Sequence, residues 1–168
     1  MKPVAQSQDE RPRADRHPRE DILDKLDRRL LARLLVEGRI SFRQVAREFG
    51  TSTSTISSRV SKLEKSGVIT GFNVAVNFEP LGYDLTAVTE ITVSKGKLPL
   101  TEKEIANLPG VCAVYDVTGE YDALVVAKFR SREELSSFAK GLLVMPFVER
   151  ANTHVVLTTV KEDFRLPL

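Results

Sequence analysis

The spacing of apolar residues changes once along this chain, and that change constrains the fold more than any other feature. Over residues 21–67 apolar side chains recur three or four positions apart, as in helices. The first such run is Leu23, Leu26, Leu30 and Leu34. From residue 68 onward, short segments alternate apolar and polar side chains, as in strands. Two periods within 168 residues predict a helical unit followed by a unit that contains a sheet.

Three short helices are predicted in the first unit, over residues 21–37, 41–49 and 52–65. Ser41 can cap the second helix while Gln44 reaches back to it, as in a capping box. Glycines at the ends of these segments supply stop signals. The side chains expected in the core of the second and third helices are Val45, Ala46, Phe49, Ile56, Val60 and Leu63.

The second unit is predicted to follow the order strand, helix, strand, strand, helix, strand. The expected strands are 85–93, 111–118, 121–129 and 151–160, and the expected helices open with capping boxes at Thr101–Glu104 and Ser131–Glu134. A further strand, 68–78, is predicted to lead out of the helical unit. The predicted fold class is α+β, with a (winged) helix-turn-helix domain followed by a βαββαβ ferredoxin-like domain.

The predicted domain boundaries follow these changes in pattern. They are a disordered tail over 1–20, a helix-turn-helix domain over 21–70, a linker strand and hinge over 71–83, a ferredoxin-like domain over 84–162 and a C-terminal tail over 163–168. The tail over 1–20 is polar and rich in proline, which disfavours a packed structure and a signal peptide. No apolar run approaches the roughly 20 residues of a membrane span. We therefore expect a cytoplasmic protein without membrane contact.

Cys112 is the only cysteine, which excludes an internal disulfide framework and a CxxC metal site. Its setting, Val-Cys-Ala-Val, predicts a buried strand position in which it acts as a small apolar residue. We predict no metal site, no catalytic residue and no cofactor.

The net charge of +2 conceals an asymmetry along the chain. Residues 21–70 hold 10 basic and 6 acidic side chains, whereas residues 71–168 hold 10 basic and 13 acidic ones. The helical unit is therefore basic and the sheet unit acidic, which predicts that the two units meet different partners.

The stretch 42–63 has the spacing of a helix-turn-helix, with small Ala46 where two helices cross and Gly50 in the turn. Its free face is expected to contact double-stranded DNA through hydroxyl groups, basic side chains and a helix N-terminus. The predicted DNA-contacting residues are Arg39, Ser41, Arg43, Ser52, Thr53, Ser54, Ser57, Ser58, Arg59 and Lys62. Because the third helix has no Asn or Gln, we expect modest base readout, with DNA shape contributing much of the specificity. The alternative is a protein-interaction bundle with a solvated basic face.

Several segments in order resemble the Lrp/AsnC family, the leucine-responsive transcription regulators. The resemblance covers about residues 22–162 and rests on LDKLDRRLL at 23–31, RVSKLE at 59–64, GVI at 67–69, FEPLG at 78–82 and TGEYD at 118–122. It implies that the sheet domain senses amino acids or related metabolites and assembles the chain into homodimers, with octamers a frequent further state. It also implies nucleoid-associated transcription regulation.

The resemblance places an effector site at TGEYD and the last strand. The implied effector-binding residues are Gly119, Glu120, Tyr121, Asp122, Asn152, Thr153 and His154. Locally, Gly119 would let backbone amides approach a carboxylate, Asp122 could pair with an ammonium group, and Tyr121 could cover an aliphatic chain. Spacing alone favours a simple two-residue hairpin turn at Gly119–Glu120. Ala151 stands where a more polar residue is expected.

Two other functions are compatible with the same fold. An architectural DNA-coating protein would need no effector. Some relatives of this pair of domains are enzymes that decarboxylate sirohaem, but His154 is the only histidine outside the N-terminal tail and no nucleophile–base pair is visible. A DNA-binding regulator, rather than an enzyme, is therefore the predicted function.

Overall fold

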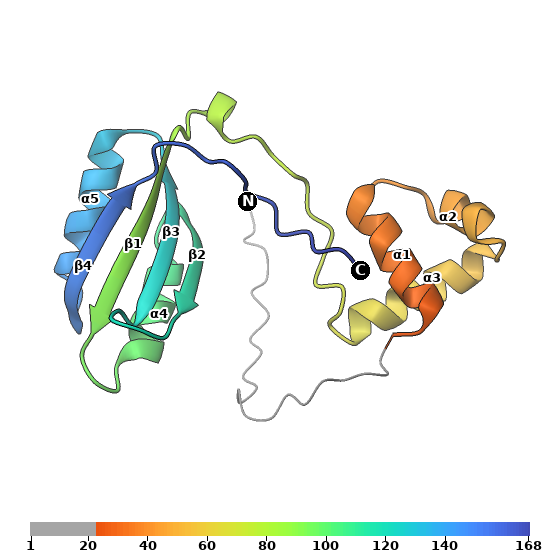
Figure 1. Cartoon of the computed structure of the whole chain (residues 1–168), viewed down its shortest axis with the longest axis horizontal. Helices are drawn as coiled ribbons and strands as arrows, with labels where there is room; N and C mark the ends of the chain where they lie inside the picture. Colours follow the sequence, from red (N-terminus) through yellow and green to blue (C-terminus); the bar gives the residue numbers. More distant parts are fainter. Residues whose placement is uncertain (1–22) are drawn as a thin grey trace. The chain divides into compact units, whose positions relative to one another are not determined.

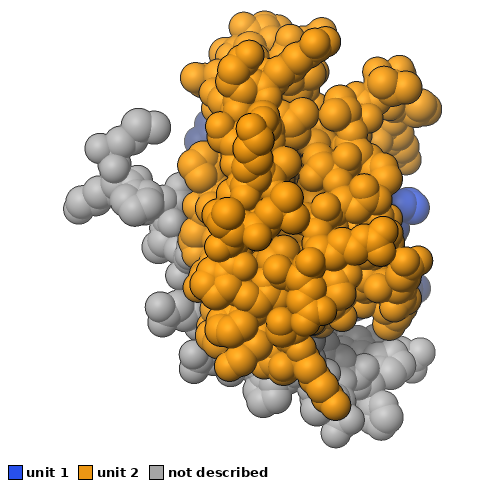
Figure 2. Space-filling model, turned by 90° about the vertical axis from the view of Figure 1, so that its left-hand side faces the viewer, with its two compact units in different colours: residues 1–74, 164–168 blue, residues 75–163 orange. Residues whose placement is uncertain are grey.

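The computed structural model describes residues 23–168, so the predicted disordered tail over 1–20 lies outside the described residues. The chain divides into two compact units. Among described residues, unit 1 comprises residues 23–74 and 164–168, and unit 2 comprises residues 75–163 (Figures 1 and 2). No helix in the described part of the chain is long and apolar enough to cross a membrane.

Unit 1 contains three helices, α1 (Lys25–Val36), α2 (Phe42–Phe49) and α3 (Thr53–Lys65), as predicted (Figure 1). Each begins with a side-chain cap, because the first backbone N–H groups of a helix lack partners within it. Asp24 and Asp27 form a reciprocal capping box at α1, so this helix begins later than the predicted residue 21. Ser41 and Gln44 form the predicted box at α2.

The three helices close around an apolar core. Its buried members are Leu30, Leu31, Leu34, Ile40, Val45, Ala46, Ile56, Val60 and Leu63. Phe49 packs against this core from a half-buried position. Gly50 ends α2 with a φ of 64°, the left-handed conformation that glycine adopts without a Cβ clash. The predicted turn of the helix-turn-helix is confirmed.

The strand predicted over residues 68–78 is wrong. The structure assigns no strand there, and every residue from 71 to 80 is exposed. The alternation of Phe72, Val74, Val76 and Phe78 is real, but a strand also needs a neighbour that accepts and donates backbone hydrogen bonds. The segment instead ends in a short 3-10 helix, η1 (Glu79–Leu81).

Unit 2 is a four-stranded antiparallel sheet with two helices, the predicted ferredoxin-like arrangement. The strands are β1 (Leu85–Val93), β2 (Val111–Asp116), β3 (Ala123–Phe129) and β4 (Val148–Val155), in the order β2-β3-β1-β4. The helices α4 (Leu98–Ala106) and α5 (Arg132–Leu143) lie on one face of the sheet (Figure 1). The opposite face, called the open face below, is covered by neither helix of unit 2.

Strict alternation in β1 and β3 decides which residues face the helices. Buried positions alternate with half-buried ones along both strands. The core between sheet and helices is formed by Ala87, Ile91, Val93, Ile105, Ala123, Val125, Ala127, Phe129, Phe138 and Leu142. Leu135 packs against this core from a half-buried position.

Three predicted boundaries in unit 2 are wrong. The last strand spans 148–155 rather than 151–160. The hairpin from β2 to β3 has a six-residue connection over 117–122 rather than a two-residue turn. The helix α4 begins at Leu98, where Pro99 fits the first turn, so Thr101 lies inside the helix and donates its hydroxyl proton to the Lys97 carbonyl.

The α5 cap is confirmed only in part. Ser131 accepts a hydrogen bond from the Glu134 backbone N–H, but the Glu134 carboxylate accepts from Arg130 rather than from Ser131. Cys112 is exposed, not buried. The pairing of β2 with β3 shifts between Val111 and Ala113, so Cys112 is the extra residue of a bulge and loses its place in the alternation.

Candidate nucleic-acid interface and ligand pocket

The helix α3 presents hydroxyl and amino groups on the face opposite its buried side chains. The exposed residues at helical spacing on this face are Ser54, Ser57, Ser58 and Lys62. Thr53 is exposed in the first turn. Lys65, which the sequence analysis did not include, is exposed three residues beyond Lys62 and extends the same face. Such groups can bond phosphate oxygens and base edges.

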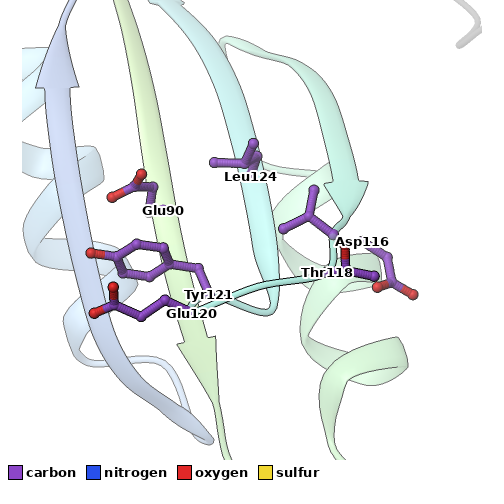
Figure 3. Close-up of a pocket in the computed structure, with 7 residues that line it drawn as sticks. Glu90, Asp116, Thr118, Glu120, Tyr121 and Leu124 are labelled. Carbon is purple, nitrogen blue, oxygen red and sulfur yellow. The ribbon is translucent and has the colours of Figure 1, made fainter.

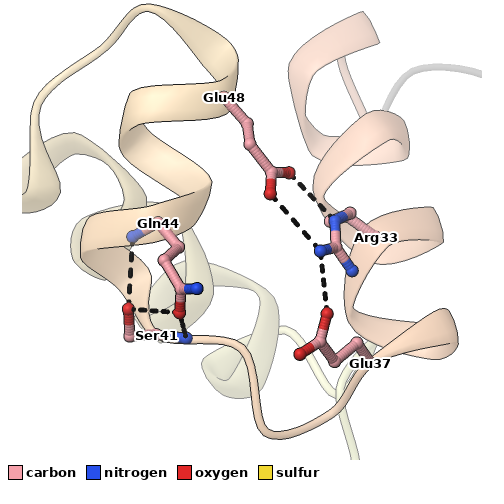
Figure 4. A network of polar contacts seen from close by, with 5 residues as sticks. All are labelled: Arg33, Glu37, Ser41, Gln44 and Glu48. Carbon is pink, nitrogen blue, oxygen red and sulfur yellow. Dashed lines mark hydrogen bonds and ion pairs between the residues drawn. The ribbon is translucent and has the colours of Figure 1, made fainter.

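Two of the predicted DNA-contacting hydroxyls are engaged as helix caps. The Ser41 hydroxyl accepts from the Gln44 backbone N–H at 3.2 Å and contacts the Gln44 side-chain oxygen at 2.9 Å (Figure 4). The Ser52 hydroxyl accepts from the Thr55 backbone N–H at 3.0 Å and contacts the Ser54 hydroxyl at 2.8 Å. These serines therefore orient α2 and α3, and their capacity for a further partner is reduced.

Arg59, predicted as a DNA-contacting residue, forms ion pairs with two carboxylates of the α1 capping box. Its Nη1 atom lies 2.5 Å from Asp24 Oδ2 and 2.7 Å from Asp27 Oδ1. Hydrogen bonds to these carboxylates raise the pKa of Arg59, and the bond to Arg59 lowers the pKa of Asp24. Asp27 is 1% exposed, so its charge needs this partner. Arg59 therefore joins α3 to α1.

A second ion-pair network connects α1 with α2. Arg33 binds Glu48 at 2.9 Å and Glu37 at 2.8 Å, and these contacts raise the pKa of the guanidinium (Figure 4). By contrast, Arg39 and Arg43 are exposed and form no ion pair with any residue in 23–168. The structure thus separates the basic side chains of unit 1 into those that hold helices together and those that face solvent.

A pocket of about 630 Å³ lies on the open face of the sheet, beside the connection from β2 to β3 (Figure 3). It is lined by Glu90, Asp116, Val117, Thr118, Glu120, Tyr121 and Leu124. Three of these residues are carboxylates, and none carries a positive charge. In Figure 3, Glu90, Glu120 and Tyr121 lie on the same side of the sheet and extend across β1. The pocket therefore favours a cationic group.

Glu90 sits within a network of polar side chains on the open face. Its Oε2 atom lies 3.3 Å from His154 Nε2 and accepts a hydrogen bond from Asn152 at 3.2 Å. The bond to His154 chiefly, with those to Asn152 and Tyr121, lowers the pKa of Glu90. Across the mouth, Arg150 lies 3.7 Å from Glu120 and 5.7 Å from the Tyr121 ring centre. A guanidinium thus stands beside the acidic pocket.

The structure brings together only part of the predicted effector site. Glu120 and Tyr121 line the pocket, and Asn152 and His154 contact it through Glu90. Gly119 belongs to the same connection but does not line the pocket. The other two residues, Asp122 and Thr153, lie elsewhere.

Asp122 and Thr153 have structural contacts instead. The Asp122 carboxylate accepts a hydrogen bond from the Val93 backbone N–H at 2.8 Å and so closes the end of β1. Thr153 faces the helices, with its hydroxyl 3.0 Å from that of Thr89, which is 1% exposed. The placement of Thr153 depends on strand register, which pairs Thr89 with Thr153 and Glu90 with Asn152.

Glu90, Asp116 and Thr118 line the pocket but were not predicted as site residues. For Glu90 a signal was present. It is the charged residue in the middle of the predicted strand 85–93, where alternation places it opposite the core-facing positions. Asp116 and Thr118 reach the pocket only because the 117–122 connection folds back over the sheet, and no local sequence pattern predicts that path.

Comparisons with known proteins agree with this geometry. A family model described as winged helix-turn-helix DNA-binding matches residues 23–70, and one described as Lrp/AsnC ligand binding domain matches residues 86–166. An HTH-type transcriptional regulator of Pyrococcus horikoshii is 51% identical over 144 residues, which cover 86% of this chain and 97% of that protein. The HTH-type transcriptional regulator FL11 of Pyrococcus abyssi is 37% identical over 146 residues, covering 87% and 97%.

Two solved structures are similar to this chain over most of its length. Escherichia coli AsnC matches with a TM-score of 0.78 and 27% identity, covering 84% of this chain and 97% of that one. A transcriptional regulator of Neisseria meningitidis in complex with L-methionine also matches with a TM-score of 0.78, at 26% identity, covering 86% and 96%. Both regions described above fall inside the residues that the two family models match.

Proposed function

The chain belongs to the Lrp/AsnC family of DNA-binding transcription regulators, and from this premise we propose that an amino acid bound to the open-face pocket modulates its DNA binding. The observation that carries the proposal is the acidic lining of that pocket, with a guanidinium at its mouth. An α-amino acid offers the complementary pair of charges, an ammonium and a carboxylate.

For the effector, Glu90 and Glu120 are the proposed partners of the ammonium group. Glu90 is the stronger candidate because it lies on β1 and is held in place by contacts with Asn152 and His154. Arg150 would bind the effector carboxylate, and the Tyr121 ring would cover the effector's side chain. The L-methionine bound by the Neisseria meningitidis regulator supports a ligand of this size and class.

For DNA, the proposed interface is the outer face of α3 with the exposed arginines before and within α2. Its members are Arg39, Arg43, Thr53, Ser54, Ser57, Ser58, Lys62 and Lys65. Ser41 and Ser52 would help indirectly, by fixing the start of each helix. Only two of these groups on α3, Lys62 and Lys65, are positively charged, so hydroxyl contacts and DNA shape would supply much of the specificity. Such a protein would act at the nucleoid in the cytoplasm.

The open face also supports self-association. It carries half-buried apolar side chains from β1 and β3, including Val88, Leu124 and Val126, and neither helix of unit 2 covers it. Pairing two such faces would bury these side chains and form a homodimer, as a first step towards an octamer. A dimer would hold two helix-turn-helix units at a set separation, so that half-sites recur near whole turns of DNA.

The effector proposal is tested by titrating the full chain with L-methionine and each other common amino acid, using the shift in melting temperature and the retention of DNA in gel-shift assays. A ligand of the native state raises the melting temperature with concentration. We expect at least one amino acid to do so and to change DNA retention. Glu90→Gln should abolish both responses to that ligand.

Glu104→Gln is the matched control, because Glu104 is an exposed carboxylate on α4, away from the open face. It should leave both responses unchanged. If no amino acid stabilises the chain while DNA is still retained, the protein coats DNA without sensing and the effector proposal fails. If Glu90→Gln keeps both the melting-temperature shift and the change in DNA retention, the ammonium group binds somewhere other than Glu90.

A further inference from the structure

A second pocket lies on the other side of the sheet, between α5 and β4. Its volume is about 510 Å³, within the range of small-molecule sites. It is lined by Leu85, Arg132, Leu135, Ser136, Ala139, Thr153 and Val155. We call it the α5–β4 groove. Because it lies on the helix-covered side, it is separate from the open-face pocket and shares none of its lining residues.

One wall of the groove is a helical stripe. Arg132, Leu135, Ser136 and Ala139 follow the spacing i, i+3, i+4 and i+7, which places them on one face of α5. Figure 1 shows α5 running alongside β4, which supplies the facing wall. From Arg132 to Ala139 the stripe extends about 10 Å along the helix axis.

The walls are mostly apolar and remain partly exposed. Leu85, Leu135 and Ala139 are half-buried, and Val155 keeps 48% of its surface exposed. Exposed apolar surface in a concave site favours a ligand that removes it from water. A ligand with an aliphatic part is therefore complementary to the walls.

The polar groups of the groove are a guanidinium and two hydroxyls. Arg132 is exposed and forms no ion pair with any other residue in 23–168. The Thr153 hydroxyl lies 3.0 Å from that of Thr89, which is buried. Whichever of the two donates, Thr153 keeps a lone pair or a proton for another partner. Its hydroxyl thus provides a polar point on the groove wall.

The two pockets have opposite electrostatic character. The open-face pocket has three carboxylates and no cation in its lining, whereas the α5–β4 groove has one cation and no carboxylate. The acidic residues nearest to Arg132 lie outside the lining of the groove. Glu133 binds the Ser131 hydroxyl and also interacts with the charge of Arg132, and Glu134 accepts a hydrogen bond from the Arg130 backbone. The groove therefore matches an anion better than an ammonium group, which would meet the positive charge of Arg132 and find only hydroxyl groups as acceptors.

We propose that the α5–β4 groove is a binding site for an aliphatic monocarboxylate without an amino group, its carboxylate on Arg132 and its chain along Leu135 and Ala139. The length of the stripe matches a chain of roughly six to eight carbons. The Ser136 and Thr153 hydroxyls lie along the groove and accommodate a polar substituent such as a 2-oxo group. This site stands apart from the proposed effector pocket and from DNA binding.

The test titrates the full chain, with methyl-labelled Leu, Val and Ala, with hexanoate, hexan-1-ol and hexylamine, and follows methyl NMR shifts. Hexanoate should shift the methyl groups of Leu85, Leu135, Ala139 and Val155, with a Kd on the order of 1 mM for so small a ligand. Hexan-1-ol should bind more weakly, and hexylamine most weakly. Arg132→Gln should weaken hexanoate binding roughly ten- to hundredfold while leaving hexan-1-ol unchanged.

Lys140→Gln is the matched control, since it removes a positive charge from an exposed position on the same helix but outside the groove. It should leave hexanoate binding unchanged. Ala139→Phe should fill the groove and block both hexanoate and the alcohol, with its melting curve confirming that it folds. The proposal is overturned if hexan-1-ol binds as tightly as hexanoate, if Arg132→Gln binds hexanoate normally, or if the shifts appear at Leu124 in the open-face pocket instead.

Discussion

Each unit of this protein contains a cluster in which carboxylates meet a basic side chain, and the two clusters differ in burial. In unit 1, Asp27 is 1% exposed and holds Arg59 between α1 and α3. In unit 2, the side chains of Glu90 and His154 are 27% and 55% exposed and stand on an open face. A buried charge depends on its partner, whereas an exposed one can exchange that partner for water or ligand. The first cluster therefore maintains the fold, and the second is available for binding.

The largest effect is expected from Arg59→Ala. It leaves the Asp27 carboxylate buried without its cation, which should lower the free energy of unfolding of unit 1 by about 2–3 kcal/mol. Hydrogen exchange of the α1 and α3 backbone amides measures this loss directly. Arg59→Lys should recover part of it. Unchanged exchange together with weaker DNA binding would show that Arg59 faces DNA after all.

A smaller, purely functional effect is expected from Lys62→Ala. Lys62 is exposed on α3 and forms no ion pair with a described residue, so unit 1 should keep its stability. Removing one phosphate contact should reduce the slope of log affinity against log salt by roughly one. Gel-shift titrations at several salt concentrations measure that slope. Lys140→Ala in unit 2 is the control. If the two variants give the same slope of log affinity against log salt, Lys62 does not contact DNA.

The smallest effect is a dependence of stability on acid. Hydrogen bonding to Arg59 lowers the folded-state pKa of Asp24, and bonding to His154 lowers that of Glu90. Both carboxylates thus stabilise the folded chain above their unfolded pKa values, near pH 4, and this stabilisation is lost as the pH falls through the lower folded values. Between pH 5 and 2.5 the melting temperature should fall less steeply with pH in Asp24→Asn and Glu90→Gln than in the wild type. If both variants lose melting temperature with pH as the wild type does, the contacts of Asp24 with Arg59 and of Glu90 with His154 do not stabilise the fold.

Local sequence signals predicted much of the fold. Ser41 and Gln44 cap α2, Ser52 caps α3, and the strand predicted over 85–93 matches β1 at both ends. These features depend on residues a few positions apart, which the sequence displays directly. The strand predicted over 68–78 failed for the complementary reason, because its alternation is local but the backbone partner that a strand requires is not.

The candidate sites were less predictable than the elements that carry them. Arg59 has the charge and spacing of a DNA contact, yet its carboxylate partners lie 35 and 32 residues earlier in the chain. Thr153 and Asn152 are neighbours in sequence, but the strand pleat directs one toward the helices and the other toward Glu90. Residue type indicated which side chains could bind a charged or polar ligand, and strand register decided which of them lie together on one face.

The amino-acid sequence by itself determined that this chain forms a basic helix-turn-helix followed by an acidic ferredoxin-like domain, because helix caps, glycines and hydrophobic periods act over a few residues. Only the tertiary structure decided which charges hold the helices together and which line an exposed pocket. Burial and strand register depend on contacts between distant segments. In a chain with a net charge of +2, these contacts pair Arg59 with buried Asp27, gather carboxylates at the open-face pocket and leave a cation at the α5–β4 groove.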